Sequence, residues 1–109
     1  MKKSNSLGIY ISIKDQLKFL NIFVDYSLLQ SGHDCQSDSV FIGKASSIKG
    51  CADLCRKQSG CQYFMLDKRD DDEKSNCFWK DMVDSSCIEG WNQDTHKNTY
   101  ALKGMQNPF

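Results

Sequence analysis

Six cysteines place the strongest constraint on how this chain folds. All of them fall in the segment from residue 35 to residue 87 of a 109-residue chain, at Cys35, Cys51, Cys55, Cys61, Cys77 and Cys87. An even number of closely spaced cysteines is typical of small domains from oxidising compartments, where disulfide bonds supplement a thin hydrophobic core. A chain of this length has room for one such core. The cysteine pattern therefore predicts a single disulfide-stabilised domain.

A structural zinc site is the alternative use of these cysteines. Three residues separate Cys51 from Cys55, which lies within the spacing of zinc ligands. A second close cysteine pair or two neighbouring histidines would have to complete the tetrahedron, but Cys77 and Cys87 are far apart and both histidines are isolated. The residues therefore favour disulfides, and an intracellular zinc-stabilised protein-interaction domain remains the second hypothesis.

Composition and motifs argue against several classes of function. Lys and Arg number 14, as do Asp and Glu, so the net charge gives no support to nucleic acid or an anionic membrane as a partner. The sequence contains no Cys-x-x-Cys, no phosphate-binding glycine loop, no His-Glu-x-x-His and no Gly-x-Ser-x-Gly. The acidic run at 70–73 lacks the spaced ligands of a calcium loop, so it predicts a solvated loop. We therefore expect a protein that is not an enzyme and holds no metal or cofactor.

The first 30 residues differ from the rest because they contain no cysteine. Residues 7–13 alternate between apolar and other residues and predict a strand, whereas residues 15–29 fit either a helix or a strand. Met1-Lys2-Lys3 resembles the start of a signal peptide, but the apolar stretch ends at Lys14 without a cleavage site, and its charges exclude a membrane span. We expect an N-terminal segment at 1–30, a turn at 31–34, and a chain that is part of a longer secreted or cell-surface protein.

Residues 47–59 predict the clearest single element, an amphipathic helix. Ser46 or Ser47 can cap its start, and Gly60 is suited to end it in a left-handed turn. One apolar stripe with the spacing of a helix face contains Ile48, Cys51, Ala52 and Cys55. Both cysteines of this helix are therefore expected to point into the core.

Two short strands are predicted after the helix, at 62–66 and 76–80, joined by a charged loop at 67–75. A last strand at 99–102 is expected to close the sheet, and residues 104–109 form a tail. Alternation places Cys77 and Trp79 on the face toward the helix, and Phe78 and Lys80 on the opposite, partly exposed face.

Three sequence pieces together resemble the PAN/apple domain family. They are Cys-Ala-Asp-Leu-Cys at 51–55, Cys-Gln-Tyr-Phe-Met-Leu at 61–66 and Cys-Phe-Trp-Lys at 77–80, where Trp79 replaces the usual leucine. The resemblance covers about Asp34 to Leu102. It implies an α+β fold, with a small disulfide-rich domain at 31–103 in which one helix packs on a short antiparallel sheet.

The resemblance also implies a disulfide pairing. In the family, the first helix cysteine is bonded to the later strand and the second to the start of the earlier strand. Transferred to this chain, these bonds are Cys51–Cys77 and Cys55–Cys61, which leaves Cys35–Cys87. The last pair departs from the family, whose outermost bond joins the two ends of the domain, because Cys87 precedes the expected last strand.

The family further implies an extracellular, non-catalytic binding or adhesion module that recognises a protein or a glycan, without membrane insertion. Sugar-binding members are similar in using exposed aromatic side chains beside lysine and histidine. The corresponding ligand-binding candidates here are Lys80, Trp91, His96 and Tyr100. The alternative is that these are scattered residues without a shared ligand.

Overall fold

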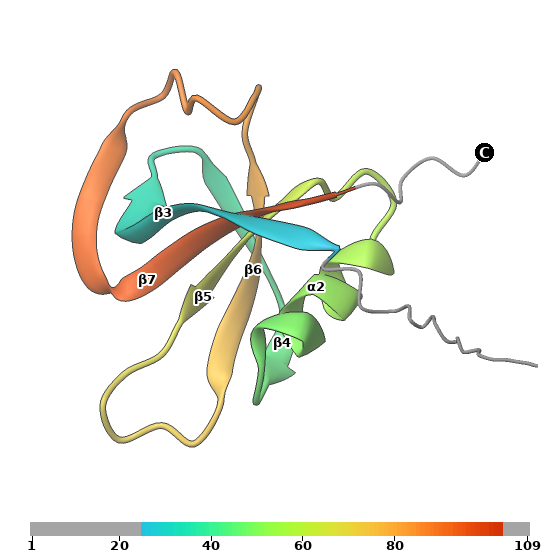
Figure 1. Cartoon of the computed structure of the whole chain (residues 1–109), viewed down its shortest axis with the longest axis vertical. Helices are drawn as coiled ribbons and strands as arrows, with labels where there is room; N and C mark the ends of the chain where they lie inside the picture. Colours follow the sequence, from blue (N-terminus) through green and yellow to red (C-terminus); the bar gives the residue numbers. More distant parts are fainter. Residues whose placement is uncertain (1–24, 104–109) are drawn as a thin grey trace, which may run out of the picture.

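The structure, a computed structural model, describes residues 25–103 as a small α+β fold with one helix on a five-stranded antiparallel sheet. Along the chain, the elements are β3 (Tyr26–Cys35), β4 (Asp38–Ala45), α2 (Ile48–Arg56), β5 (Tyr63–Asp67), β6 (Ser75–Asp81) and β7 (Trp91–Leu102). The strand order is β3-β7-β5-β6-β4, and α2 packs against β4, β5 and β6 (Figure 1). The coarse prediction of a helix on an antiparallel sheet is confirmed.

Helix α2 begins where the sequence predicts and ends earlier. Ser47, rather than Ser46, is the cap, because its hydroxyl accepts a hydrogen bond from the Gly50 N–H at 3.0 Å. The predicted end at residue 59 is wrong, since the helix stops at Arg56. Cys55 and Cys61 are bonded with Cα atoms 5.4 Å apart, whereas six helical residues would advance by about 9 Å. The disulfide therefore requires the chain to turn back before Cys61.

Three disulfides connect elements that are distant in sequence. They join Cys51 on α2 to Cys77 on β6, Cys55 to Cys61, and Cys35 at the end of β3 to Cys87 in the loop 82–90. These are the three pairs that the resemblance implied. No cysteine has a free thiol, so no sulfur in this structure is available as a zinc ligand.

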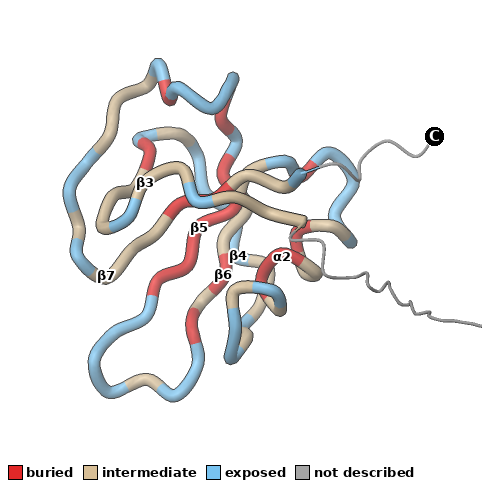
Figure 2. The backbone as a smooth tube through the Cα atoms, in the orientation of Figure 1, coloured by how far each residue is buried: buried red, intermediate tan, exposed pale blue. Residues whose placement is uncertain are grey.

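The main core lies between α2 and the sheet. Phe64 on β5 is fully buried and stacks on Tyr100 of β7, with ring centroids 5.2 Å apart. Figure 2 shows the buried residues concentrated on β5 and along one side of α2. The buried members of this cluster are Cys51, Ala52, Cys55, Cys61, Phe64, Leu66, Cys77 and Tyr100. The helix stripe predicted from the sequence therefore supplies one wall of the core.

The loop between β5 and β6 is slightly shorter than predicted. Both strands extend by one residue into the predicted loop, so that Asp67 and Ser75 are strand residues and are buried. The remaining residues, 68–74, are almost all exposed. These strands pair antiparallel, with Phe64 opposite Trp79 and Leu66 opposite Cys77.

Strand β7 is longer than the predicted strand at 99–102 and lies inside the sheet. It spans Trp91–Leu102 and pairs with β3 on one side and β5 on the other. The prediction that this strand closes the sheet is wrong. The first half of β7 is largely exposed and polar, so its sequence shows no apolar alternation. Its backbone groups are satisfied by pairing with β3.

The turn predicted at 31–34 is a bulge within β3. Gly32 takes a left-handed φ of 68°, its N–H donates to Asn98 Oδ1 at 2.7 Å, and the strand continues to Cys35. Glycine thus marks an irregular strand position rather than a chain reversal. The predicted boundary at residue 31 falls inside β3.

Other predictions concern residues that the structure describes only in part. The strand predicted at 7–13, most of the segment 15–29 and the tail at 104–109 lie outside the described residues; the last residues of 15–29 belong to β3. Strand β4 was not predicted. Val40, Phe41 and Ile42 are consecutive apolar residues, and the bulge at Gly43 interrupts any alternation.

Candidate functional site

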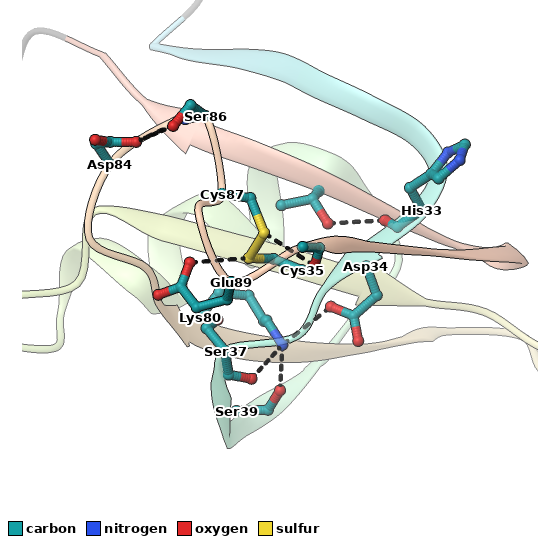
Figure 3. The surroundings of a disulfide bond; sticks show 12 residues. His33, Asp34, Cys35, Ser37, Ser39, Lys80, Asp84, Ser86, Cys87 and Glu89 are labelled. Atoms are coloured by element: carbon teal, nitrogen blue, oxygen red, sulfur yellow. Dashed lines mark hydrogen bonds and ion pairs between the residues drawn. A yellow bond between two sulfur atoms is a disulfide. The ribbon is translucent and has the colours of Figure 1, made fainter.

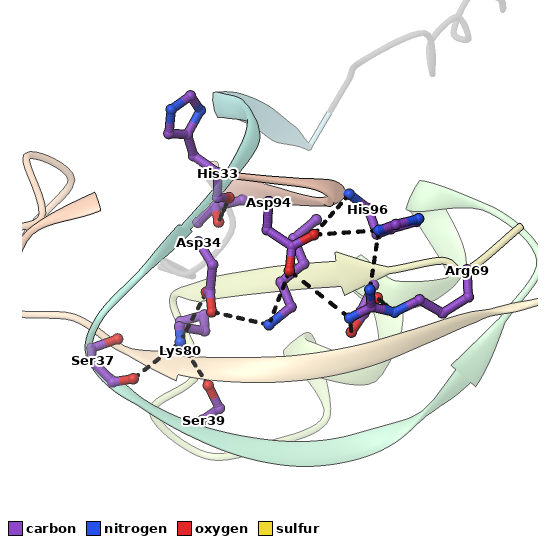
Figure 4. Close-up of polar contacts among 11 residues, drawn as sticks. His33, Asp34, Ser37, Ser39, Arg69, Lys80, Asp94 and His96 are labelled. Carbon is purple, nitrogen blue, oxygen red and sulfur yellow. Dashed lines mark hydrogen bonds and ion pairs between the residues drawn. The ribbon is translucent and has the colours of Figure 1, made fainter. Parts of the chain in front are cut away.

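Lys80 is buried, so the prediction that it is partly exposed is wrong. Its side chain is 1% exposed, and Nζ lies 3.0 Å from Asp34 Oδ1. Nζ also donates to the Ser37 carbonyl at 3.0 Å and to Ser39 Oγ at 2.6 Å (Figure 4). The alternation along β6 placed Lys80 on the correct face of the strand. The connection between β3 and β4 covers that face and buries the side chain. A surface ligand would not reach the ammonium group.

Tyr100 belongs to the main core. Its ring stacks on Phe64 and meets Tyr26 edge-on at a centroid distance of 5.9 Å. Burial, together with the neighbouring Tyr26, raises the pKa of the Tyr100 phenol above its usual value. The position of Tyr100 is explained by packing.

Trp91 is half-buried at the start of β7. It packs against a second, smaller core cluster that contains Cys35, Met82 and Cys87. Two of its members, Met82 and Cys87, belong to the loop 82–90. Trp91 therefore supports the loop.

His96 lies in β7 instead of the predicted polar loop and is partly exposed. Its Nδ1 is 3.0 Å from Arg69 Nη1 and 3.4 Å from Asp94 Oδ1 (Figure 4). The same guanidinium pairs with Asp67, with Nε 2.9 Å from Oδ1. The His96 backbone N–H, helped by nearby Arg69 and Lys97, lowers the pKa of the Asp94 carboxyl despite some desolvation.

This ionic group attaches the loop 68–74 to the sheet. The Lys68 N–H donates to the His96 carbonyl at 3.0 Å, and the Arg69 side chain spans from β5 to β7. Each charge in the group has an opposite charge close by, which favours a structural role. No hydrogen bond or ion pair joins any two of the four predicted ligand-binding residues, so the structure does not assemble them into one site.

Among residues 25–103, the loop 82–90 presents the most exposed large apolar side chains, and this surface was not predicted from the sequence. Val83 and Ile88 are each 69% exposed. The sequence did contain a signal for this loop. Val83 and Ile88 flank the turn-forming run Asp84-Ser85-Ser86, and Cys87 and Gly90 lie in the same segment.

Backbone and side-chain bonds hold this loop in one shape (Figure 3). The Asp84 carboxylate accepts from the Ser86 N–H at 2.9 Å and from the Ser86 hydroxyl at 2.5 Å, which lowers the pKa of Asp84. The Gln36 N–H donates to the Gly90 carbonyl at 2.9 Å, and the disulfide fixes Cys87 to Cys35. Cys87 takes a left-handed φ of 54°, which is uncommon for a residue other than glycine.

Two further features were considered as binding sites. Cys35, Cys87 and Glu89 form the one metal-like group within residues 25–103, but both sulfurs belong to a disulfide and neither is a thiolate. An open hollow of about 280 Å³ lies where α2 ends, between Arg56 and Leu102. Arg56 already pairs with Asp25 at 2.7 Å, so the hollow offers no free charge to a ligand.

Comparison of the chain with protein-family models, with curated proteins and with solved structures finds no match in any of the three. In the described part of the chain, no helix is long and apolar enough to cross a membrane.

Proposed function

We propose that this chain is an extracellular, non-catalytic binding module of the PAN/apple type, part of a longer secreted or cell-surface protein. It recognises a protein or a carbohydrate, and a protein is the first candidate. The support for this assignment is the two disulfides Cys51–Cys77 and Cys55–Cys61, which match the bonds of the family, together with a helix on an antiparallel sheet.

The observation that most strongly supports a protein ligand is the exposed apolar surface of the loop 82–90. Exposed apolar side chains on a preorganised loop lose little conformational freedom when they bind, so more of their burial appears as affinity. Val83 and Ile88 fit this description, because the Cys35–Cys87 disulfide and the turn at Asp84 together fix the shape of the loop that carries them. A sugar site would instead require polar groups that converge around an exposed aromatic ring.

The surroundings of the two histidines support a non-catalytic role. His33 Nδ1 contacts the Ser31 carbonyl at 2.9 Å, and His96 contacts Arg69 and Asp94. A nucleophilic enzyme would place a hydroxyl or thiol within reach of its base. Within residues 25–103, the hydrogen bonds and ion pairs of both histidine rings are made to other groups and to no hydroxyl or thiol.

Binding screens test the class of ligand. The oxidised chain is applied to arrays of extracellular proteins and to glycan arrays, and each hit is repeated with Val83→Asp and Ile88→Asp. We expect a protein hit that either substitution weakens at least tenfold. Leu28→Asp is the control, because Leu28 is 53% exposed on a different element. Binding to glycans alone, or protein binding that survives both substitutions, would contradict the proposal.

Thiol titration under denaturing, non-reducing conditions tests the zinc-stabilised alternative. The extracellular module has no free thiol among its six cysteines. Six titratable thiols with one bound zinc would overturn the extracellular assignment.

A further inference from the structure

Strand β4 forms an open edge of the sheet. Within residues 25–103 it pairs only with β6, and its first four residues, 38–41, are all exposed. Val40 is 51% exposed and Phe41 is 54% exposed. An edge with free backbone groups and apolar side chains is a template for another strand.

The charges along β4 are self-complementary. Asp38, with Asp81 opposite it on β6, makes one end of the edge acidic, and Lys44 makes the other end basic. None of these three residues has an ion-pair partner in the described part of the chain. When two copies of β4 run antiparallel, the acidic end of each lies beside the basic end of the other.

We propose that the β4 strands of two copies of this chain pair edge to edge, antiparallel, about a two-fold axis at Phe41. The axis brings the two Phe41 side chains together on the face opposite α2. Phe41 already contacts Phe78 of β6 edge-on, with ring centroids 5.6 Å apart. The dimer thus extends this pair into a row of four rings, an arrangement that stabilises cross-strand contacts. This inference does not depend on the proposed ligand.

The bulge in β4 sets the register at the ends of the interface. On β6, Phe41 pairs with Phe78 and Gly43 with Cys77, so Ile42 and Gly43 together occupy one strand position. Lys44 of one copy then lies opposite Ser39 of the other, one residue from Asp38. The lysine side chain is long enough to approach the carboxylates at that end.

The expected dimer is weak. One short strand edge buries less surface than the roughly 1,200 Å² of the smallest stable interfaces. The dimer should therefore dissociate on dilution and weaken in high salt, because part of its attraction comes from exposed charges.

Sedimentation equilibrium of the full chain, from micromolar to millimolar concentration at low salt, tests the proposal. Asp38→Lys and Lys44→Asp should each weaken the dimer about fivefold, because each variant places like charges at both ends of the interface. An equimolar mixture of the two variants should recover the affinity, since every end then pairs opposite charges. Asp71→Lys and Lys74→Asp, in the exposed loop 68–74, are the matched controls and should change nothing.

Phe41→Lys provides a second test through a different interaction. It places two ammonium groups at the axis and should abolish the dimer, while unchanged circular dichroism shows that the fold is intact. Four results would overturn the proposal: a monomer with an uncovered edge at every concentration, a dimer insensitive to all three β4 variants, no recovery in the mixture, or a monomer in which the amides on the open side of β4, those not bonded to β6, are protected from hydrogen exchange. The last would mean that a segment of the same chain covers the edge.

Discussion

At the residue scale, Lys80 shows how this small protein accommodates a buried charge. Its ammonium is enclosed by one carboxylate from the end of β3, one carbonyl from the β3–β4 connection and one hydroxyl from the start of β4. Desolvation makes a buried charge costly unless such partners compensate for it. These contacts of Lys80 therefore fix the β3–β4 connection against β6.

Replacing Lys80 should destabilise the protein strongly. Lys80→Ala leaves the mostly buried Asp34 carboxylate without its closest partner, and we expect a loss of about 3 kcal/mol in the free energy of unfolding. Urea denaturation measures this loss. Lys74→Met, at an exposed loop position, is the control and should change stability by less than about 0.5 kcal/mol. A Lys80→Ala variant as stable as the control would show that the ion pair contributes nothing.

Asp84 should make the loop 82–90 sensitive to acid. The Ser86 hydroxyl and N–H lower the pKa of the Asp84 carboxyl below its ordinary value of 3.8, so the unfolded chain binds this proton more tightly than the folded chain. The stabilisation is present above pH 3.8 and is lost as the pH falls below that value.

Asp84→Asn isolates this contribution, because an amide oxygen accepts the same hydrogen bonds without titrating. Urea denaturation of both proteins at neutral pH and below pH 3.8 should give a smaller loss of stability for the variant. Equal losses in the two proteins would exclude Asp84 as a source of the acid dependence.

The residue scale also shows where prediction of the site from the sequence stops. Alternation along β6 places Lys80 and Trp79 on the correct faces, because that pattern is local. The exposure of Lys80 depends on the β3–β4 connection, which is distant in sequence. The spatial separation of Trp91, His96 and Tyr100 likewise follows from the course of β7, which local composition does not encode.

At the scale of elements, the start of α2 depends on one side chain. Ser47→Ala removes the hydroxyl that accepts the Gly50 N–H and should lower the free energy of unfolding by about 1 kcal/mol. Thermal or urea denaturation measures the change. Ser46→Ala is the matched control, since Ser46 is exposed and does not cap the helix, and the assignment of the cap fails if both variants lose the same stability.

Elements with a buried face were predictable, and those without one were not. Helix α2 and strands β5 and β6 each bury an apolar side against the core, which produces the periodicity in their sequences. Strand β4 and the first half of β7 are largely exposed, and the bulge at Gly43 interrupts alternation in β4. Their strand conformation is fixed by pairing with distant partners.

At the scale of the whole molecule, the three disulfides should contribute unequally to stability. They close segments with sequence separations of 52, 26 and 6 residues for Cys35–Cys87, Cys51–Cys77 and Cys55–Cys61. The loss of chain entropy in the unfolded state predicts contributions of about 4, 3.5 and 2 kcal/mol in that order.

Paired substitution of each disulfide by alanine tests this order. Urea denaturation should show the smallest loss for Cys55→Ala with Cys61→Ala. If that variant were the least stable, constraint of the unfolded chain would not be the main source of stabilisation. The packing of α2 in the native state would then account for the difference.

The first and last described residues of the chain lie next to each other. The Lys103 N–H donates to the Asp25 carbonyl at 2.9 Å, because the first strand and the last strand are paired along their lengths. Adjacent ends of this kind are the reason that insertion into another protein and circular permutation are tolerated. The same fold is therefore compatible with insertion into a loop of a host protein, or with a circularly permuted order whose new ends lie in the exposed loop 68–74.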